Sequence, residues 1–313
     1  MKAMTLDSYG MTPKLTELPT PRPGANEVLV KVKALSINPI DWKQASGKGR
    51  PIITAKFPNF IPGYDLAGVV ESLGPGVTSF TLGQRVHTRL FSQRGGASAE
   101  FAVAGLDVLN PIPEKMDFAQ AAGLPLAGMT ALQGLRDACL LPMSGATQRV
   151  LIIGASGGVG HLAVQIARST GATVVGVCSA KNAELVKRLG ASDTIDYSKP
   201  DAYAGVAPFD VIYDCVGNSP GAFLKLLTPR GRFASCLPGP GVFAHAALNL
   251  VRGRKVLPVM LSSNAADLGV LDSLVTKGAL EVVIDSRFPF AELPAAWARS
   301  SSGRAVGKII VEL

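Results

Sequence analysis

The sequence predicts an α/β protein with two parts: a β-rich, barrel-like region and a parallel sheet covered by helices on both faces. The first 120 residues are rich in proline and glycine, with short alternating apolar runs that are typical of strands separated by turns. From about Ala122, continuous Val/Ile runs alternate with helical segments, as in βαβ units. A chain of 313 residues is also longer than one compact core supports, so two domains are expected.

In the β-rich region, the runs EVLVKVK at residues 27–33 and LAGVVE at residues 66–71 predict strands, because apolar side chains recur at every second position. Turn signals separate such runs, for example PRPG at residues 21–24 and LGPG at residues 73–76.

The tail of the chain returns to β character at residues 282–290 and 308–313, and we expect it to rejoin the first region. The predicted domains are therefore residues 1–121, completed by residues 279–313, and residues 122–278 between them.

The second part should contain six strands with helices between them. The strands are predicted at residues 150–154, 173–178, 194–197, 209–216, 231–237 and 255–261, and the helices at residues 158–170, 182–189, 220–227 and 266–277. Strands made of continuous apolar runs are buried on both faces, which indicates a parallel sheet.

Composition narrows the classes of function. Apolar residues make up 47% of the chain and charged residues 17%, a balance that excludes a disordered chain. The net charge of +8 raises the question of nucleic-acid binding, but no block of about five basic residues occurs and the aromatic residues are sparse. We therefore expect no nucleic-acid partner. An anionic cofactor, or peripheral contact with an anionic membrane surface, suits the excess charge.

The four cysteines are Cys139, Cys178, Cys215 and Cys236, and no two of them form a C-x-x-C pair. This spacing argues against a disulfide framework or a structural zinc and indicates a reducing compartment. The amino terminus starts with a strand-like run and lacks a secretory or transit signal, so a cytoplasmic location is expected. Residues 150–167 carry no ionised side chain, but their central glycines favour a strand, a turn and a helix over a membrane span.

The clearest motif is the loop GASGGVG at residues 154–160, which follows an apolar strand and opens a helix. Gly157 and Gly158 let the backbone approach a pyrophosphate, and Gly160 allows close packing of helix and strand. The free N–H groups of the first helical turn would face the anion. The loop therefore predicts a dinucleotide-binding Rossmann domain. His161 could touch phosphate, although capping or packing is the favoured alternative.

The end of the second strand bears on the choice of nicotinamide cofactor. An NAD site usually places a carboxylate there to hold the ribose 2′-hydroxyl. This chain has CSAK at residues 178–181, with Ser179 and Lys181 available to bind a 2′-phosphate and no carboxylate to repel it. The predicted cofactor is NADPH.

Several separate segments together resemble one enzyme family over nearly the full length of the chain. They are SINPIDWK at residues 36–43, PGYDLAGVV at 62–70, AGMTAL at 127–132, the glycine loop, DVIYDCVG at 210–217 and AVGKIIV at 305–311. The chain resembles the zinc-free medium-chain dehydrogenases/reductases of the quinone oxidoreductase type. Residues 282–286 and 303–311 look especially similar to the plant members of this family that are located at the chloroplast envelope.

The resemblance implies a GroES-like catalytic domain formed by both ends of the chain around an inserted Rossmann NADP-binding domain, with the cofactor in the cleft between them. It also implies a homodimer made by edge pairing of the last Rossmann strand, here residues 256–261. For location, it adds an alternative to the cytoplasm: peripheral attachment to the chloroplast envelope without a cleavable transit peptide.

The chain departs from zinc-dependent relatives of this family at their metal ligands. In those relatives a Cys stands where this chain has Asn38, and a His-Glu pair stands where it has Tyr64 and Asp65. Their four-cysteine lobe should fall near residues 91–100, where this chain has no cysteine. A catalytic zinc needs three protein ligands around an open position. We therefore expect no metal and no alcohol oxidation through a zinc alkoxide.

Without a Lewis acid, the expected reaction is hydride transfer from NADPH to the activated C=C of an α,β-unsaturated carbonyl, such as an enone, an enal or an oxidised-lipid ketone. Two alternatives stay open: an NADPH:quinone reductase, and a non-catalytic NADPH-binding protein. The small-molecule partner is accordingly an enone or a quinone.

The resemblance also assigns site residues. Tyr64 would donate to the substrate oxygen, Lys43 would contact cofactor or substrate, and Asn38 would bond the nicotinamide ribose or the substrate. The alternatives are a packing tyrosine, a surface lysine and a brace for the turn before Pro39, and Asp41 would orient Lys43. The expected cofactor contacts are Lys43, Thr130, Ser156, Gly157, Gly158, Val159, Gly160, Ser179, Lys181, Tyr197, Cys215, Val216, Leu237 and Lys308.

Overall fold

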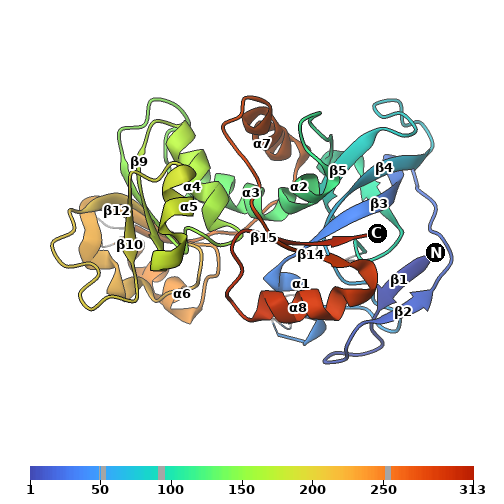
Figure 1. The fold of residues 1–313 in the computed structure, drawn as a ribbon, viewed down its shortest axis with the longest axis horizontal. Coiled ribbons are helices and arrows are strands. Elements are labelled where there is room, and N and C mark those ends of the chain that lie inside the picture. The colour runs from blue at the N-terminus through green and yellow to red at the C-terminus, as the bar shows by residue number, and fades with distance from the viewer. Residues whose placement is uncertain (49, 51–53, 91–95, 251–254) are drawn as a thin grey trace. The chain divides into compact units, whose positions relative to one another are not determined.

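The computed structural model describes residues 1–48, 50, 54–90, 96–250 and 255–313 (Figure 1). The chain divides into two compact units. Unit 1 consists of residues Met1–Leu126 and Ser263–Leu313, and unit 2 consists of residues Ala127–Ser262.

Unit 1 is built on a seven-stranded sheet to which both ends of the chain contribute. The C-terminal strand β15 pairs antiparallel with β3, and β14 runs parallel to β15. The strand order is β14-β15-β3-β4-β5-β7, while β6 also pairs with β3 and β1 and β2 form a separate ribbon. The bounds are β1 (Lys2–Thr5), β2 (Lys14–Glu17), β3 (Glu27–Ile37), β4 (Asp65–Leu73), β5 (Arg85–Arg89), β6 (Phe101–Gly105), β7 (Leu109–Pro111), β14 (Ile284–Pro289) and β15 (Lys308–Glu312).

The core of unit 1 follows from the alternation of side chains along these strands. Val30 and Val32 of β3 point to the same side and pack with Leu66 of β4 in one buried cluster. Two helices cover the sheet: α2 (Phe118–Gly123) packs on β3 and β4, and α8 (Leu293–Ser301) packs on β14 and β15 (Figure 1). The sheet is therefore shielded where its strands are most apolar.

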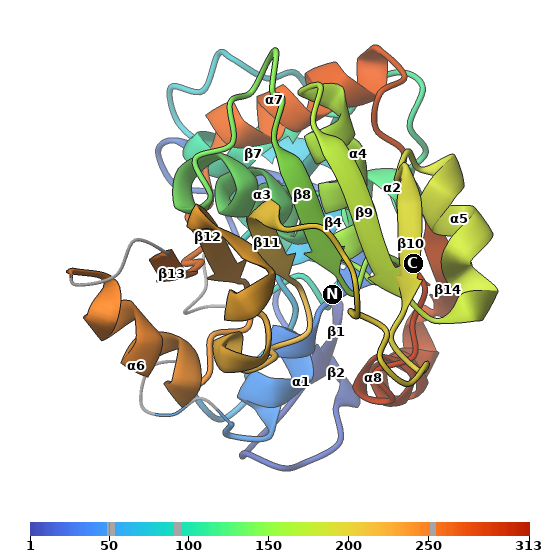
Figure 2. The same cartoon turned by 90° about the vertical axis from the view of Figure 1, so that its left-hand side faces the viewer.

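Unit 2 contains a sheet of six parallel strands, which confirms the predicted parallel architecture. Figure 2 shows the strands side by side in the order β10-β9-β8-β11-β12-β13. In chain order this is 3-2-1-4-5-6, the arrangement of a doubly wound nucleotide-binding sheet. The bounds are β8 (Arg149–Ile153), β9 (Thr173–Cys178), β10 (Asp193–Asp196), β11 (Phe209–Asp214), β12 (Leu227–Ser235) and β13 (Lys255–Pro258).

Helices connect the strands of unit 2. They are α3 (Pro125–Gln133), which starts in unit 1 and continues as a π-helical turn over Gly134–Ala138, α4 (Gly160–Ser169), α5 (Ala183–Arg188) and α6 (Pro240–Ala247). α4 packs on β8 and β9, α5 packs on β9 and β10, and α6 packs on β13.

Two predicted elements of this unit are wrong in detail. The helix expected at residues 220–227 is a pair of short 3-10 turns, because Leu227 already pairs with Phe209 and starts β12. The last strand, expected to reach residue 261, ends at Pro258, which lies opposite the last residue of β12.

The boundary between the units also differs from residues 122–278. Helix α7 (Ala265–Thr276) follows the alternating pattern in sequence, but it belongs to unit 1. Asn110 donates to the Asp272 carboxylate at 3.1 Å, while His87 Nε2 lies 3.1 Å from the other carboxylate oxygen without forming a hydrogen bond, and the helix packs on β7.

No helix within the described ranges is both long and apolar enough to cross a membrane. The uncharged run at residues 150–167 forms β8, the glycine turn and most of α4.

Candidate functional site

The glycine loop lies where β8 ends and α4 begins, at the carboxyl edge of the unit 2 sheet. Gly154 has φ +78°, which a residue with a side chain rarely adopts. A Cβ on Gly160 would lie 2.0 Å from the Gly154 carbonyl oxygen, so only glycine lets the first turn of α4 sit this close to the strand end. The turn is tight because both positions are glycine.

The loop presents unused backbone donors. Within the described ranges, the N–H groups of Ser156, Gly158 and Val159 donate to no other group of the chain. They lie at the amino end of α4, where the helix dipole adds partial positive charge. This arrangement can hold an anion such as a pyrophosphate.

The His161 side chain packs against the glycine loop. It is fully buried, and its Nδ1 lies 2.9 Å from the Gly157 carbonyl oxygen. This geometry supports the capping and packing interpretation, because the ring holds the loop and does not face solvent.

A second loop follows β11, the neighbour of β8 at the point where the strand order reverses. The buried Asp214 carboxylate accepts hydrogen bonds from the N–H groups of Val216, Gly217 and Asn218 at 2.8 to 3.2 Å, and from the Ser235 hydroxyl at 3.0 Å. Ligands of open α/β sheets bind beside such a reversal. Asp214 fixes this loop, and sequence reasoning missed that role because no local signal marks it.

The loop after β11 meets the glycine loop and the loop after β12. A Cβ on Gly154 would lie 2.6 Å from a methyl carbon of Val216, and one on Gly217 would lie 3.4 Å from Leu237. Val216 and Leu237 keep 54% and 39% of their surface exposed, although both are apolar. The structure therefore brings these two predicted cofactor contacts to the edge that carries the glycine loop.

The predicted 2′-phosphate residues lie at the ends of β9 and β10. Cys178 is paired with Asp196, so Ser179 and Tyr197 directly follow two neighbouring strands. Lys181 is exposed in the 3-10 turn after β9. The three side chains thus come from one corner of the sheet.

Asp196 stands in the same corner, and sequence reasoning missed it because it considered only the end of β9. Its Oδ1 accepts from the Ser198 hydroxyl at 2.8 Å and from the Ser198 N–H at 3.1 Å, and the Ala180 N–H also donates to the carboxylate. The hydroxyl of Ser198, followed by these N–H groups, lowers the pKa of Asp196, so a negative charge lies beside Ser179 and Lys181.

Thr130 lies in α3, where its carbonyl oxygen accepts a hydrogen bond from the Tyr213 hydroxyl at 2.7 Å. Its side chain is 7% exposed. Cys215, which directly follows β11, is partly buried on the same sheet edge as Val216.

The remaining candidates lie in unit 1. Asn38 precedes α1 (Pro39–Ala45) and is almost completely buried. Its Nδ2 donates to Asp65 Oδ2 at 2.9 Å, and its Oδ1 accepts from the Lys308 ammonium at 2.6 Å. Lys308 is 3% exposed. Asn38 and Lys308 are thus engaged with each other inside unit 1, an arrangement that favours the bracing interpretation of Asn38.

Two carboxylates surround this contact. Burial raises the pKa of Asp65, and Lys308 and Asn38 oppose that rise. Burial also raises the pKa of Asp41, to about 8, although the Asn38 N–H donates to Asp41 Oδ2 at 2.7 Å. Burial lowers the pKa of Lys308, against the attraction of the two carboxylates. We call Asn38, Asp41, Asp65 and Lys308 the buried polar cluster.

Asp41 therefore caps the start of α1, and no described contact joins it to Lys43. The Lys43 ammonium lies over the ring of Trp42, 5.5 Å from the ring centroid, and forms no ion pair with a described residue. Trp42 in turn donates to the Ser300 hydroxyl at 3.1 Å. Among the three residues expected to contact the substrate, Lys43 is the one whose polar group could still bind a ligand.

Tyr64 is fully buried, and its hydroxyl donates to Gln44 Oε1. The guanidinium of Arg89 lies 5.6 Å from the centroid of its ring. Burial raises the pKa of the Tyr64 hydroxyl above its ordinary range. These contacts favour a packing tyrosine over a donor to substrate.

In the described part of the chain, no group of three His, Cys, Asp or Glu side chains is arranged to hold a metal ion. Residues 91–100, the expected counterpart of the four-cysteine lobe of zinc-dependent relatives, lie partly outside the described residues.

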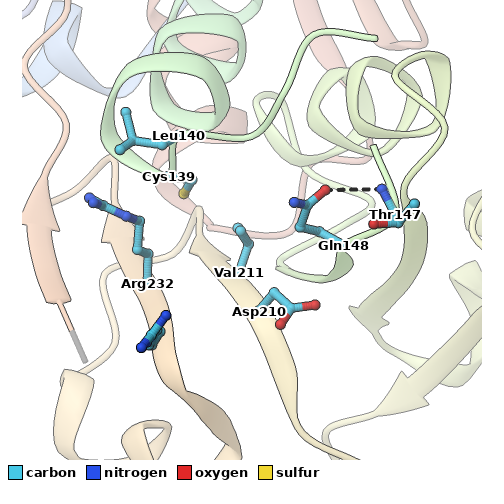
Figure 3. A pocket seen from close by; sticks show the side chains of 8 residues that line it. Cys139, Leu140, Thr147, Gln148, Asp210, Val211 and Arg232 are labelled. Carbon is cyan, nitrogen blue, oxygen red and sulfur yellow. Dashed lines mark hydrogen bonds between the residues drawn. The ribbon is translucent and has the colours of Figure 1, made fainter. Parts of the chain in front are cut away.

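A pocket of about 310 Å³ opens elsewhere in unit 2 (Figure 3). Its lining includes Thr147 and Gln148, which precede β8, Asp210 and Val211 at the start of β11, and Arg232 of β12. It therefore lies at the amino ends of the strands, the edge opposite the glycine loop, and contains none of the predicted site residues.

Two family models match the chain. One, described as an alcohol dehydrogenase GroES-like domain, covers residues 24–114, and the other, described as a zinc-binding dehydrogenase, covers residues 189–311. The first match confirms the predicted GroES-like fold of the amino-terminal region.

Individual proteins match over the whole chain. It is 39% identical to the chloroplast envelope quinone oxidoreductase homolog of Arabidopsis thaliana, over 100% of this chain and 98% of that protein. It is 30% identical to the chloroplastic NADPH-dependent alkenal/one oxidoreductase of the same organism, over 99% of this chain and 79% of that protein. The structure of the quinone oxidoreductase from Coxiella burnetii superimposes with a TM-score of 0.89 at 32% identity, covering 100% of this chain and 99% of that one.

Proposed function

This chain belongs to the quinone oxidoreductase family of the medium-chain dehydrogenases/reductases, and we propose that it reduces the activated C=C bond of α,β-unsaturated carbonyls with NADPH, independently of zinc. It is an NAD(P)H-dependent oxidoreductase by family. The observation that carries the cofactor part is the set of unused N–H donors at Ser156, Gly158 and Val159. When bound, a nicotinamide cofactor supplies a hydride.

The residues at the carboxyl edge of unit 2 fit such a cofactor. The glycine loop would hold the pyrophosphate, and Val216 and Leu237 offer apolar surface for the nicotinamide end. Ser179 and Lys181 would hold a 2′-phosphate. The negative charge of Asp196 would repel that phosphate. Hydrogen bonds from Ser198 and Ala180 to the Asp196 carboxylate partly offset this repulsion.

The substrate class rests on what unit 1 offers. Reduction of an enone places negative charge on the carbonyl oxygen, which needs a hydrogen-bond donor. Lys43 has an ammonium without an ion-pair partner among the described residues, so it would donate to that oxygen. Asn38 and Tyr64 would act through the packing of the site, because their polar groups are engaged. The name of one relative, an alkenal/one oxidoreductase, supports the same class.

Single-turnover mixing of the protein with NADPH and an enone tests this proposal. We expect oxidation of NADPH, followed by absorbance, together with a saturated ketone identified by mass spectrometry. NADPH should be preferred over NADH. Binding of NADPH without turnover of any enone or quinone would contradict the proposal and support a non-catalytic NADPH-binding protein.

A second candidate function is reduction of quinones, favoured by the names of the relatives that match over the full length. A benzoquinone in the same assay would then give a hydroquinone, while the enone would be returned unchanged. The two acceptors compared at equal concentration decide between the functions.

We also propose a homodimer formed through β13. This strand is an edge of the described sheet and pairs with β12 on one side only, and Val256 and Leu257 give it apolar character. The Asn249 side chain binds the Val256 N–H and carbonyl oxygen at 2.8 and 2.7 Å, so a second copy would have to displace it. Exposed strand edges invite pairing with a second copy. Sedimentation of the protein, with Leu257→Lys as the variant expected to dissociate it, tests this assembly.

Peripheral attachment to an anionic membrane is the last part of the proposal, since the net charge is +8 and one relative is named for the chloroplast envelope. Flotation with anionic and with neutral vesicles, before and after a salt wash, distinguishes it from a cytoplasmic protein. Binding that is equal for both vesicle types would contradict it.

A further inference from the structure

Two cysteines occupy equivalent places at the carboxyl edge of unit 2. Cys215 directly follows β11, and Cys236 directly follows β12. The last paired residues of these parallel strands are Asp214 and Ser235, so the cysteines are the next pair in register. The Cys236 N–H continues the ladder by donating to the Asp214 carbonyl oxygen at 3.1 Å.

This register places the two thiols side by side. Adjacent strands lie about 4.8 Å apart, within the range of about 4.4–6.8 Å that disulfides span between Cα atoms. Alternation turns Cys215 and Cys236 to the same face as Tyr213 and Ala234, which are paired two residues earlier. The Cys215 thiol lies in hydrogen-bonding contact with the Cys236 thiol.

The other two cysteines differ in environment. Cys139 and Cys178 are buried, whereas Cys215 and Cys236 are partly exposed. Only the pair at the strand ends therefore combines proximity with partial exposure of its residues, and we assign the first reaction with the reagent to Cys236 because the Cys215 thiol itself is buried. Cys139 and Cys178 provide matched controls.

Each cysteine is joined to a loop that forms the cofactor edge. Cys215 leads into Val216, whose side chain packs on Gly154, and Cys236 leads into Leu237, which lies against Gly217. A disulfide needs its Cβ atoms about 3.8 Å apart, roughly 1 Å less than the strand spacing. Its formation would pull both loops together, away from the arrangement that Asp214 holds.

We propose that Cys215 and Cys236 form a reversible disulfide that weakens dinucleotide binding at the adjacent loops. The inference rests on the proposed cofactor site and adds a regulation to it.

The oxidant is a low-molecular-weight disulfide. One thiolate, Cys236 in this scheme, attacks a sulfur of that disulfide and forms a mixed disulfide, and one equivalent of thiol leaves. The Cys215 thiolate then attacks the mixed disulfide at Cys236, the protein S–S bond forms, and the second thiol leaves. The cysteines lose two electrons to the reagent, and the departing thiolates take up the two protons.

The environment of Cys215 determines the rate at which its thiolate attacks the mixed disulfide. Burial raises the pKa of its thiol, and the neighbouring Cys236 and Asp214 add to this effect. Since the thiolate is the attacking species, closure should be slow at neutral pH and faster at pH 9. Because the strands lie farther apart than the Cβ separation that a disulfide needs, the bond would be strained and readily reduced, so it should open with dithiothreitol.

The test uses the full chain, incubated with glutathione disulfide and then digested without reduction. We expect a peptide pair linked through Cys215 and Cys236, and about tenfold weaker NADPH binding by fluorescence titration, equal to about 1.4 kcal/mol. Dithiothreitol should restore the binding. Cys236→Ser should bind NADPH as the reduced protein does and should not respond to the reagent, while Cys139→Ala should keep the response.

The outcomes separate the two proposals. If the reduced protein does not bind NADPH, the proposed function fails whatever the cysteines do. If it binds NADPH but no linked peptide forms, or if the linked protein binds NADPH with unchanged affinity, the switch is wrong. A response that persists in Cys236→Ser also contradicts it.

Discussion

The two units differ in how their polar groups are engaged. In unit 1, the buried Asn38 side chain bonds to Asp65 at 2.9 Å and to Lys308 at 2.6 Å, although Asp41 Oδ1 beside them is buried without a hydrogen-bond partner in the described part of the chain. In unit 2, the Asp214 carboxylate accepts hydrogen bonds from a loop, while the N–H groups at the start of α4 find no partner among the described residues. Satisfied polar groups stabilise a fold, whereas unsatisfied ones at an open edge invite a ligand. The comparison shows that the unused donors of the glycine loop lie in unit 2, whereas Asn38 and Lys308 are engaged inside unit 1.

The strongest test of this contrast removes the cation from the buried polar cluster. In Lys308→Met the ammonium is lost and the Asp65 carboxylate stays buried without its compensation, so we expect about 3–5 kcal/mol less stability. Urea unfolding followed by circular dichroism measures it. Lys277→Met, at an exposed lysine, is the control and should change stability little. Equal stability of both variants would contradict the role of the cluster.

The second test addresses the glycine loop. Gly160→Ala places a Cβ where the Gly154 oxygen lies 2.0 Å away, so the loop must move. We expect about 1–3 kcal/mol of destabilisation from overpacking, together with loss of measurable NADPH binding. Gly239→Ala, where an added Cβ meets nothing within 4 Å, is the matched variant and should bind NADPH normally. Retained binding in Gly160→Ala would mean that the cofactor lies elsewhere.

The third test uses pH to probe the same cluster. The pKa of Asp41 is raised to about 8 from its ordinary 3.8, so between these values the folded state holds a proton that the unfolded state has lost. The contribution of Asp41 to stability is therefore present in acid and is lost as pH rises toward 8, by at most about 1.4 kcal/mol per pH unit. The stability of Asp41→Asn, measured by urea unfolding from pH 5 to 8, should depend less on pH than that of the parent. Parallel curves would show that Asp41 does not titrate in this range.

The smallest effect is expected at the cofactor corner. Lys181→Ala removes an exposed ammonium next to the proposed 2′-phosphate site, and we expect about a tenfold loss in NADPH affinity, close to 1.4 kcal/mol, with NADH binding unchanged. Titration with both cofactors measures the ratio. Lys187→Ala, on the following helix, serves as the control. An unchanged ratio would remove Lys181 from the site.

Local sequence was sufficient where the signal itself was local. Continuous Val/Ile runs predicted the strands of unit 2, and the glycine loop was recognised from the strand and helix around it. The sequence offered no such signal for Asp214, whose partners include Ser235 on another strand, or for the contact between Lys308 and Asn38, 270 residues apart. Asp196 was missed for the same reason, because its relation to Ser179 arises only when β10 pairs with β9.

Helix α7 shows that a local pattern does not tell which unit an element joins. Its helical periodicity was recognised, but its membership of unit 1 depends on Asn110 and on packing against β7, far away in sequence. Periodicity predicts the type of an element and says nothing about its neighbours in space.

The pairing of β15 with β3 has a consequence for synthesis on the ribosome. Unit 2 is one continuous segment and can fold as soon as it emerges, whereas the sheet of unit 1 must wait for Lys308–Glu312. Until then β6 covers residues 27–31 of β3 but residues 34–37 have no partner on that side, and a chain without β15 would expose this part of the edge to chaperones or to other nascent chains. The sheet of unit 1 is thus completed by a strand that lies more than 270 residues along the chain from β3.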